Sequence, residues 1–165
     1  MRKARNVSPT PARERALRRL EDLCREHGER LTRPRRAVLA TLLSARRPLS
    51  AYELLDLLRA EDGKSTAASV YRTLDFLRAL GIVHRLESTR SFVLCEHLEG
   101  PHWVQFLICR RCGQVVEAED ERIAAATERL GQRLGFALDQ RIVELTGVCE
   151  GCRASAACHW RPGAR

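Results

Sequence analysis

Residues 65–95 read STAASVYRTLDFLRALGIVHRLESTRSFVLC, and this stretch decides the fold. Its first half predicts a helix, because apolar side chains recur at helical spacing at Val70, Leu74, Leu77 and Leu80. Ser65 or Thr66 can cap the start of this helix, and Gly81 follows its last turn.

The second half of the stretch predicts a β-hairpin. Residues 82–87 and 91–95 are short apolar segments on either side of a polar Ser88-Thr89-Arg90 turn. Helices followed by a small hairpin are typical of a winged helix-turn-helix, in which the last helix before the hairpin enters the major groove of DNA.

Three earlier helices complete this predicted module. Residues 12–27 carry one, after a basic arm over residues 1–11. Thr32 can cap a second helix that has Pro34 in its first turn, where the missing N–H is harmless. The segment Ser50-Ala51-Tyr52-Glu53 is a capping box that starts the third.

The pattern changes beyond the hairpin. Strands are predicted over 103–109, 114–119 and 136–148, with an amphipathic helix over 120–134. The fold class is therefore α+β, an N-terminal winged helix-turn-helix followed by a small α/β domain. The predicted divisions are a winged-helix domain over 1–95, a hinge over 96–102, a second domain over 103–152 and a tail over 153–165.

Charge is distributed unevenly along the chain. Residues 1–90 hold 20 Lys and Arg against 11 Asp and Glu, whereas residues 91–165 hold 9 against 10. A basic half indicates a polyanionic partner such as nucleic acid, and a solvated basic surface is the plainer alternative. No apolar run is long enough to span a membrane and no signal-peptide core follows the N-terminus, so a cytoplasmic protein is expected.

Six of the seven cysteines lie in the near-neutral half. Two Cys-x-x-Cys pairs, separated by 36 residues, are formed by Cys109, Cys112, Cys149 and Cys152. Two such turns supply the four sulfurs of a closed tetrahedral zinc site, which is structural because no ligand position stays open. Thiol–disulfide chemistry is the competing interpretation of the same pairs.

A second group of metal donors is more scattered. His84 and Cys95 lie on the two predicted hairpin strands, His102 follows the hinge, and Glu117 lies on the strand after the first cysteine pair. One zinc ion held by all four would tie the two modules together. Equally, each histidine could be an ordinary surface residue and Cys95 a buried apolar one, and His97 competes with His102.

The motifs in combination resemble the ferric uptake regulator family of bacterial metal sensors, and within it the zinc uptake regulator branch. The resemblance covers roughly residues 15–152 and is carried by LTRPRR at 31–36, SAYELLDLL at 50–58, SVYRTLDFL at 69–77, VHRLES at 83–88 and FVLC at 92–95. Arg33 stands where the family usually has proline.

The resemblance implies both a function and its cofactor. It implies structural zinc on the four paired cysteines and regulatory zinc on His84, Cys95, His102 and Glu117, two ions per subunit. It further implies that residues 1–95 are the DNA-binding domain and that residues 103–152 are a zinc-binding dimerisation domain, a small α/β dimerisation domain. The homodimer would bind double-stranded operator DNA when the regulatory site is filled, and repress zinc uptake genes.

Residue chemistry suggests which side chains contact DNA. Arg72 is the choice for a base contact, because its guanidinium matches the edge of guanine, and Tyr71 is its neighbour. Candidates for phosphate contacts are Tyr52, Arg33, Arg35, Arg36 and Lys64, with solvated surface as the alternative for each.

Three rival functions follow from the same residues. An enzyme would need an open zinc and a general base, and no His-Glu-x-x-His motif is present, so neither catalysis nor a small-molecule substrate is expected. A thiol-redox regulator would use the cysteine pairs as a switch. A regulator of the same family could respond to another metal or to peroxide.

Overall fold

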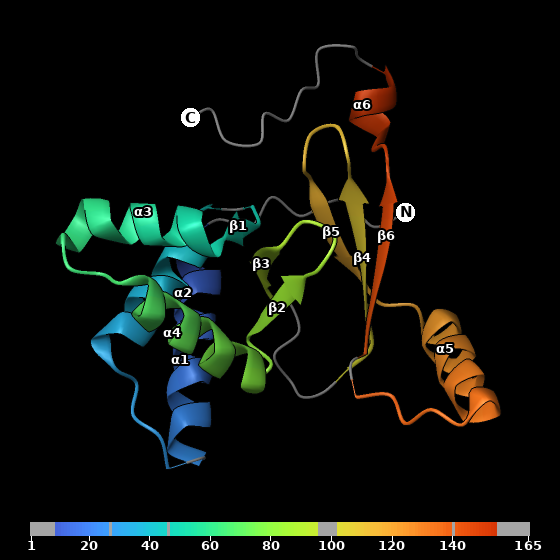
Figure 1. Cartoon of the computed structure of the whole chain (residues 1–165), viewed down its shortest axis with the longest axis horizontal. Coiled ribbons are helices and arrows are strands. Elements are labelled where there is room, and N and C mark those ends of the chain that lie inside the picture. Colours follow the sequence, from blue (N-terminus) through green and yellow to red (C-terminus); the bar gives the residue numbers. More distant parts are fainter. Residues whose placement is uncertain (1–8, 27, 46, 96–101, 140, 155–165) are drawn as a thin grey trace. The chain divides into compact units, whose positions relative to one another are not determined.

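The computed structural model describes residues 9–26, 28–45, 47–95, 102–139 and 141–154 (Figure 1). The chain divides into two compact units, residues 1–99 and residues 100–165, here called the N-terminal unit and the C-terminal unit. Most of the predicted hinge, His97 and most of the predicted tail lie outside the described residues. Among the described helices, none has both the length and the apolar character needed to cross a membrane.

The described residues of the N-terminal unit form four helices and a three-stranded sheet. In chain order these are α1 (Pro9–Glu26), α2 (Arg33–Ala45), β1 (Leu49–Ser50), α3 (Ala51–Asp62), α4 (Ala67–Ala79), β2 (Val83–Leu86) and β3 (Ser91–Leu94). The strand order is β1-β3-β2, and both pairings are antiparallel. The predicted arm over 1–11 is wrong at its end, because α1 already begins at Pro9, and the first turn of a helix tolerates proline.

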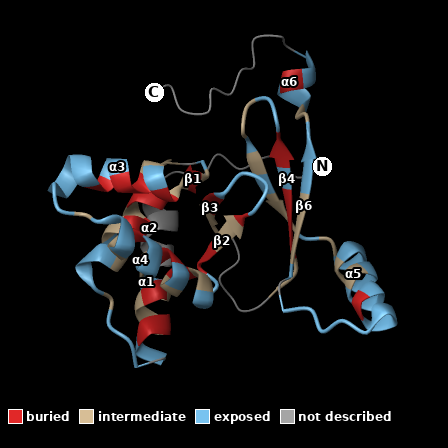
Figure 2. Ribbon diagram, viewed as in Figure 1, coloured by how far each residue is buried: buried red, intermediate tan, exposed pale blue. Residues whose placement is uncertain are grey.

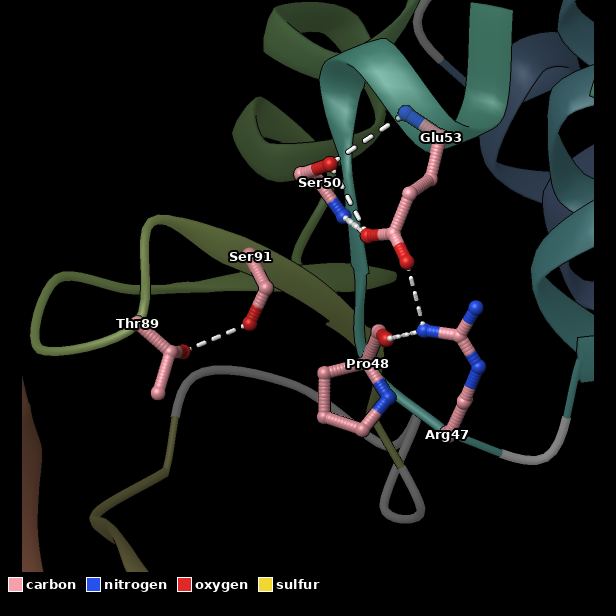
Figure 3. Close-up of polar contacts among 6 residues, drawn as sticks. All are labelled: Arg47, Pro48, Ser50, Glu53, Thr89 and Ser91. Carbon is pink, nitrogen blue, oxygen red and sulfur yellow. Dashed lines mark hydrogen bonds and ion pairs between the residues drawn. The ribbon is translucent and has the colours of Figure 1, made fainter. Parts of the chain in front are cut away.

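Local signals determine where α3 and α4 begin. Ser50 accepts a hydrogen bond from the N–H of Glu53, and the Glu53 carboxylate accepts one in return from the N–H of Ser50 (2.8 Å). Figure 3 shows this capping box together with Arg47, which donates to Glu53 at 2.8 Å. Thr66 caps α4 by accepting from the N–H of Ser69 (3.3 Å). The predicted starts of both helices are confirmed.

Every buried side chain of the main apolar cluster lies in the N-terminal unit. The inner faces of its helices appear red in Figure 2, and the cluster includes the fully buried Leu39, Leu54 and Leu74. On α4 the buried positions Val70, Thr73, Leu74 and Leu77 form one face. The opposite face of α4 is therefore left to solvent, and it carries Tyr71 and Arg72.

In the C-terminal unit, the part of the chain that the structure describes forms one thin sheet and two helices. Its elements are β4 (Val104–Cys109), β5 (Val115–Ala118), α5 (Glu121–Leu134), β6 (Ile142–Gly147) and α6 (Glu150–Ala154). The strand order is β5-β4-β6, with β5 antiparallel and β6 parallel to β4. Figure 2 shows α5 almost wholly exposed.

The strand predicted over 136–148 is wrong in its first part, since β6 starts only at Ile142. Gly135 takes a left-handed conformation (φ 74°), and the N–H of Phe136 donates to the carbonyl of Gly131 (2.9 Å). This is the 6→1 bond of a helix C-cap, so Phe136 closes α5 and does not begin a strand.

Candidate functional site

The parallel pairing of β4 with β6 brings the two cysteine pairs to the same end of the sheet. Cys109 lies at the end of β4 opposite Gly147, so Cys149 and Cys152 follow just beyond the pairing. The first pair is closed by a tight turn, in which Gly113 has φ 68° and donates its N–H to the carbonyl of Cys109 (2.9 Å).

The four sulfurs form one cluster. The Sγ atoms of Cys109, Cys112, Cys149 and Cys152 all lie within 4.8 Å of one another. The Cys152 residue is fully buried, and Arg111 donates to its carbonyl at 2.7 Å. Four thiolate donors are the set that structural zinc prefers, so these residues fit the ion that the resemblance implies.

Backbone N–H groups around Cys109 favour the thiolate form of its side chain. The N–H of Cys149 donates to Cys109 Sγ at 3.3 Å. This bond, followed by one from the N–H of Cys112, lowers the pKa of Cys109 to about 6. A thiol with a lowered pKa is more readily deprotonated near neutral pH, and the thiolate is the form that binds a metal ion.

The N-terminal unit positions two further metal donors at the base of its hairpin. His84 lies on β2 opposite Val93, and Cys95 follows β3, where its N–H donates to the carbonyl of Ile82 (2.9 Å). Because the strands are antiparallel, the donor atoms of His84 and Cys95 approach within 4.8 Å. One imidazole and one buried thiol thus lie close enough together to bind the same metal ion.

The C-terminal unit carries a matching pair. His102 precedes β4 and Glu117 lies on β5, and His102 Nε2 is 3.8 Å from Glu117 Oε1. A third donor, Glu119, lies at the same distance, with its Oε1 3.8 Å from His102 Nε2. Glu119 was not predicted as a metal donor. The signal that could have indicated it is its place two residues after Glu117, which puts both side chains on the same side of an extended strand.

The side chains proposed to meet DNA fall into two groups. Tyr52, Tyr71 and Arg72 are exposed, Tyr52 at 71% and Tyr71 at 45%, and Arg33 and Lys64 are exposed as well. Lys64 lies in the turn between α3 and α4, where Asp62 accepts its N–H (2.9 Å). That bond, with others from Ser65, lowers the pKa of Asp62.

Arg35 and Arg36 form the second group, because both side chains have partners within the N-terminal unit. Arg35 stacks on the Phe76 ring at 3.3 Å and donates to Glu29 at 3.1 Å. Arg36 donates to Glu21 at 2.7 Å, which links α2 to α1. These contacts give both arginines a part in the fold of the unit.

Comparison with known proteins decides the family. The sequence model of the ferric uptake regulator family matches residues 26–146, well over half of the 165 residues. The chain belongs to the ferric uptake regulator family. The matched span contains α2 to β5, both hairpin donors and the His102–Glu117 pair of this family member.

Relatives place the chain in the zinc uptake regulator branch of the family. The zinc uptake regulation protein of Escherichia coli (strain K12) is 39% identical over 143 residues, which cover 86% of this chain and 84% of that protein. A solved zinc uptake regulator complexed with zinc and DNA has a TM-score of 0.82 at 38% identity, covering 90% of this chain and 99% of that one. The crystal structure of holo XcZur has a TM-score of 0.76 at 42% identity, covering 87% and 100%.

The fold prediction is confirmed by these family members. An N-terminal winged helix-turn-helix followed by a small α/β module is the architecture that the two solved relatives share with this chain. The second cysteine pair lies just outside the span that the family model matches. Its inclusion in the candidate site therefore rests on the short distances between the four sulfurs.

Proposed function

We propose that this protein is a zinc-responsive transcriptional repressor. It binds operator DNA as a dimer when its regulatory zinc site is filled, and so controls zinc uptake genes. The observation that carries the proposal is the likeness, at 38% identity over 90% of the chain, to a zinc uptake regulator complexed with zinc and DNA. We further propose that the protein acts in the cytoplasm, where its DNA partner is found, without catalysis and without a small-molecule substrate.

In this proposal α4 is the recognition helix. Its buried face fixes it to the core, and Tyr71 and Arg72 lie on the open face. Arg72 has the bidentate donors that discriminate guanine, with about 1–3 kcal/mol per good base contact. Tyr52, Arg33 and Lys64 are proposed for phosphate contacts, whereas the internal partners of Arg35 and Arg36 favour a structural role for these two.

Two zinc ions per subunit are proposed. Cys109, Cys112, Cys149 and Cys152 would hold the structural ion, whose closed thiolate shell stabilises the C-terminal unit. His84 and Cys95 from one unit, with His102 and Glu117 from the other, would hold the regulatory ion. One thiolate among nitrogen and oxygen donors favours zinc over iron(II) or manganese.

In the sequence, two of the proposed regulatory ligands precede the hinge and two follow its first residues. An ion bound by all four would therefore couple metal binding to the arrangement of the two units. When both pairs bind the same ion, they restrict the two units to one arrangement, so the population of DNA-competent dimers rises. A ten- to hundred-fold gain in DNA affinity needs about 1.4–2.8 kcal/mol of coupling free energy. This is within the range of known allosteric coupling.

Apolar surface on the C-terminal unit supports the homodimer. Leu107 lies opposite Val116 on one side and Leu145 on the other, so the three form a row across the sheet, and all are nearly half exposed. On α5 the exposed Ile123, Leu130 and Leu134 recur at helical spacing. Contiguous exposed apolar surface of this kind is typical of a protein–protein interface.

The test is a Cys95→Ser variant in a DNA-binding titration. Fluorescence anisotropy with a duplex selected from a random pool should show that the wild-type chain binds tightly only at high buffered zinc. Cys95→Ser should lose at least tenfold of that zinc-dependent gain while keeping its dimer and the zinc of the four cysteines. Cys24→Ala is the control, because Cys24 is a core residue of the N-terminal unit. Equal zinc dependence in Cys95→Ser and wild type contradicts the proposal.

A further inference from the structure

Three donors gather on one side of the C-terminal sheet. Glu117 lies on β5 opposite Phe106, and Glu119 comes two residues later, so both carboxylates project to the same side. His102 lies two residues before β4 begins. The antiparallel pairing of β4 with β5 brings the segment before β4 next to the end of β5.

The distances place both carboxylates around one ring nitrogen. His102 Nε2 lies 3.8 Å from Glu117 Oε1 and 3.8 Å from Glu119 Oε1. Two ligand atoms bound to one tetrahedral zinc at about 2.1 Å are separated by about 3.4 Å. Each of the two His102–carboxylate separations is therefore about 0.4 Å longer than the spacing expected for a shared ion.

We propose that Glu119 is a further metal ligand, and that His102, Glu117 and Glu119 form a half-site able to bind a divalent cation within the C-terminal unit alone. This inference rests on the proposed function, because it concerns the regulatory ion. The three donors all lie within the C-terminal unit, so binding of an ion by them does not require His84 or Cys95.

The chemistry of the three donors defines what the half-site accepts. One imidazole and two carboxylates accept several divalent cations, and such a set binds zinc and cobalt(II) more tightly than manganese(II). Addition of the Cys95 thiolate is the step that selects zinc. Glu119 lies on the solvent-exposed side of the proposed half-site, because its side chain is 42% exposed whereas that of Glu117 is 3% exposed.

The experiment measures metal binding by the full chain, with no DNA present. The four cysteines are first loaded with zinc, and Co²⁺ is then titrated by calorimetry and visible absorbance. A His84→Ala, Cys95→Ser double variant removes the donors of the N-terminal unit and isolates the half-site. Glu119→Gln is compared in both backgrounds with Glu121→Gln, a nearby exposed carboxylate that starts α5.

The double variant should still bind one Co²⁺, without a thiolate charge-transfer band. Adding Glu119→Gln should weaken that binding ten- to hundred-fold, and adding Glu121→Gln should leave it unchanged. In the otherwise wild-type chain, Glu119→Gln should weaken binding of the second ion by a smaller factor. Far-UV circular dichroism and one retained zinc per chain verify the fold of each variant.

Two results would overturn the inference. One leaves the proposed function intact, and the other contradicts it as well. If Glu119→Gln behaves like Glu121→Gln while the wild-type chain binds its second ion, Glu119 is no ligand and the proposed function stands. If the wild-type chain binds no second ion, the regulatory site of the proposed function fails too.

Discussion

The two units of the chain differ in how they bury apolar side chains. The N-terminal unit holds the entire main cluster of buried residues, including Leu39, Leu54 and Leu74. In the C-terminal unit the buried apolar set among the described residues is small, and Leu107, Leu130 and Leu145 are among the exposed ones.

This difference indicates how each unit is stabilised. A unit with capped helices around a closed core is stabilised by its own burial. A thin sheet with one exposed helix buries little apolar surface and needs another source of stability. The four clustered cysteines could supply it by binding a metal ion, and the apolar row could supply it by packing against a second copy of the chain. The predictions below separate these two modes of stabilisation.

The largest effect is expected on removing one thiolate of the cysteine cluster. Cys149→Ser should unfold the C-terminal unit, because structural zinc contributes about 10–16 kcal/mol in zinc-finger peptides and a domain has only about 5–15 kcal/mol of stability. Circular dichroism should show lost strand signal with the helices of the N-terminal unit retained. Cys24→Ala should keep its zinc. A Cys149→Ser chain that melts like the wild type contradicts the expected metal dependence.

The converse change targets the core of the N-terminal unit. Leu74 is fully buried on α4, so Leu74→Ala should cost about 2–5 kcal/mol in that unit. Leu57 is 43% exposed on α3, so Leu57→Ala should cost less than about 0.5 kcal/mol. Denaturant melts of both variants check this, and zinc content should not change in either. Equal losses would show that the two leucines are equally buried in solution.

An intermediate effect is expected at the apolar row of the C-terminal sheet. Leu145→Glu places a charge in the proposed dimer interface and should weaken dimerisation by about 2 kcal/mol or more. Leu145→Ile keeps the apolar surface and serves as the matched control. Sedimentation equilibrium measures both. Unchanged dimerisation in Leu145→Glu would remove this face from the interface.

The smallest effect is expected at the start of α3. Burial opposes ionisation of Glu53, yet bonds from the N–H of Ser50 and from Arg47 hold the pKa of this carboxyl below its usual value of 4.5. Its stabilising contribution is therefore complete above pH 4.5 and is lost as pH falls through the lower folded-state pKa. Because the side chain is partly exposed, about 0.5–1 kcal/mol is expected.

The measurement for α3 is the melting temperature of the N-terminal unit at pH 7 and pH 3. Glu53→Gln should be less stable than the wild type at pH 7, and the difference should be smaller at pH 3. Ser50→Ala should cost about 1 kcal/mol at pH 7 through loss of the cap. A difference between Glu53→Gln and wild type that grows in acid would reverse the expected sign.

Signals confined to a few residues predicted much of the fold. The capping box at Ser50, the cap at Thr66 and the hairpin after Gly81 are all present, because each depends on neighbours in the chain. The two Cys-x-x-Cys turns were also local signals. Their meeting needed only that β4 and β6 end side by side, which the parallel pairing provides.

Features that depend on distant contacts were not predicted. The two-residue strand β1 exists only through its pairing with β3, and nothing in Leu49-Ser50 marks it. The stacking of Arg35 on Phe76 requires α2 and α4 to meet. Glu119 became a candidate ligand only when the register of β4 with β5 placed it near His102.

The central claim is that zinc controls DNA recognition by the N-terminal unit, and one selection experiment tests it most directly. The purified protein would be incubated with a random duplex library at two buffered free-zinc levels, and the bound DNA sequenced. The account predicts enrichment of an inverted repeat at the higher zinc level only. Enrichment of the same repeat at both levels would contradict it and would remove zinc sensing from the function of this chain.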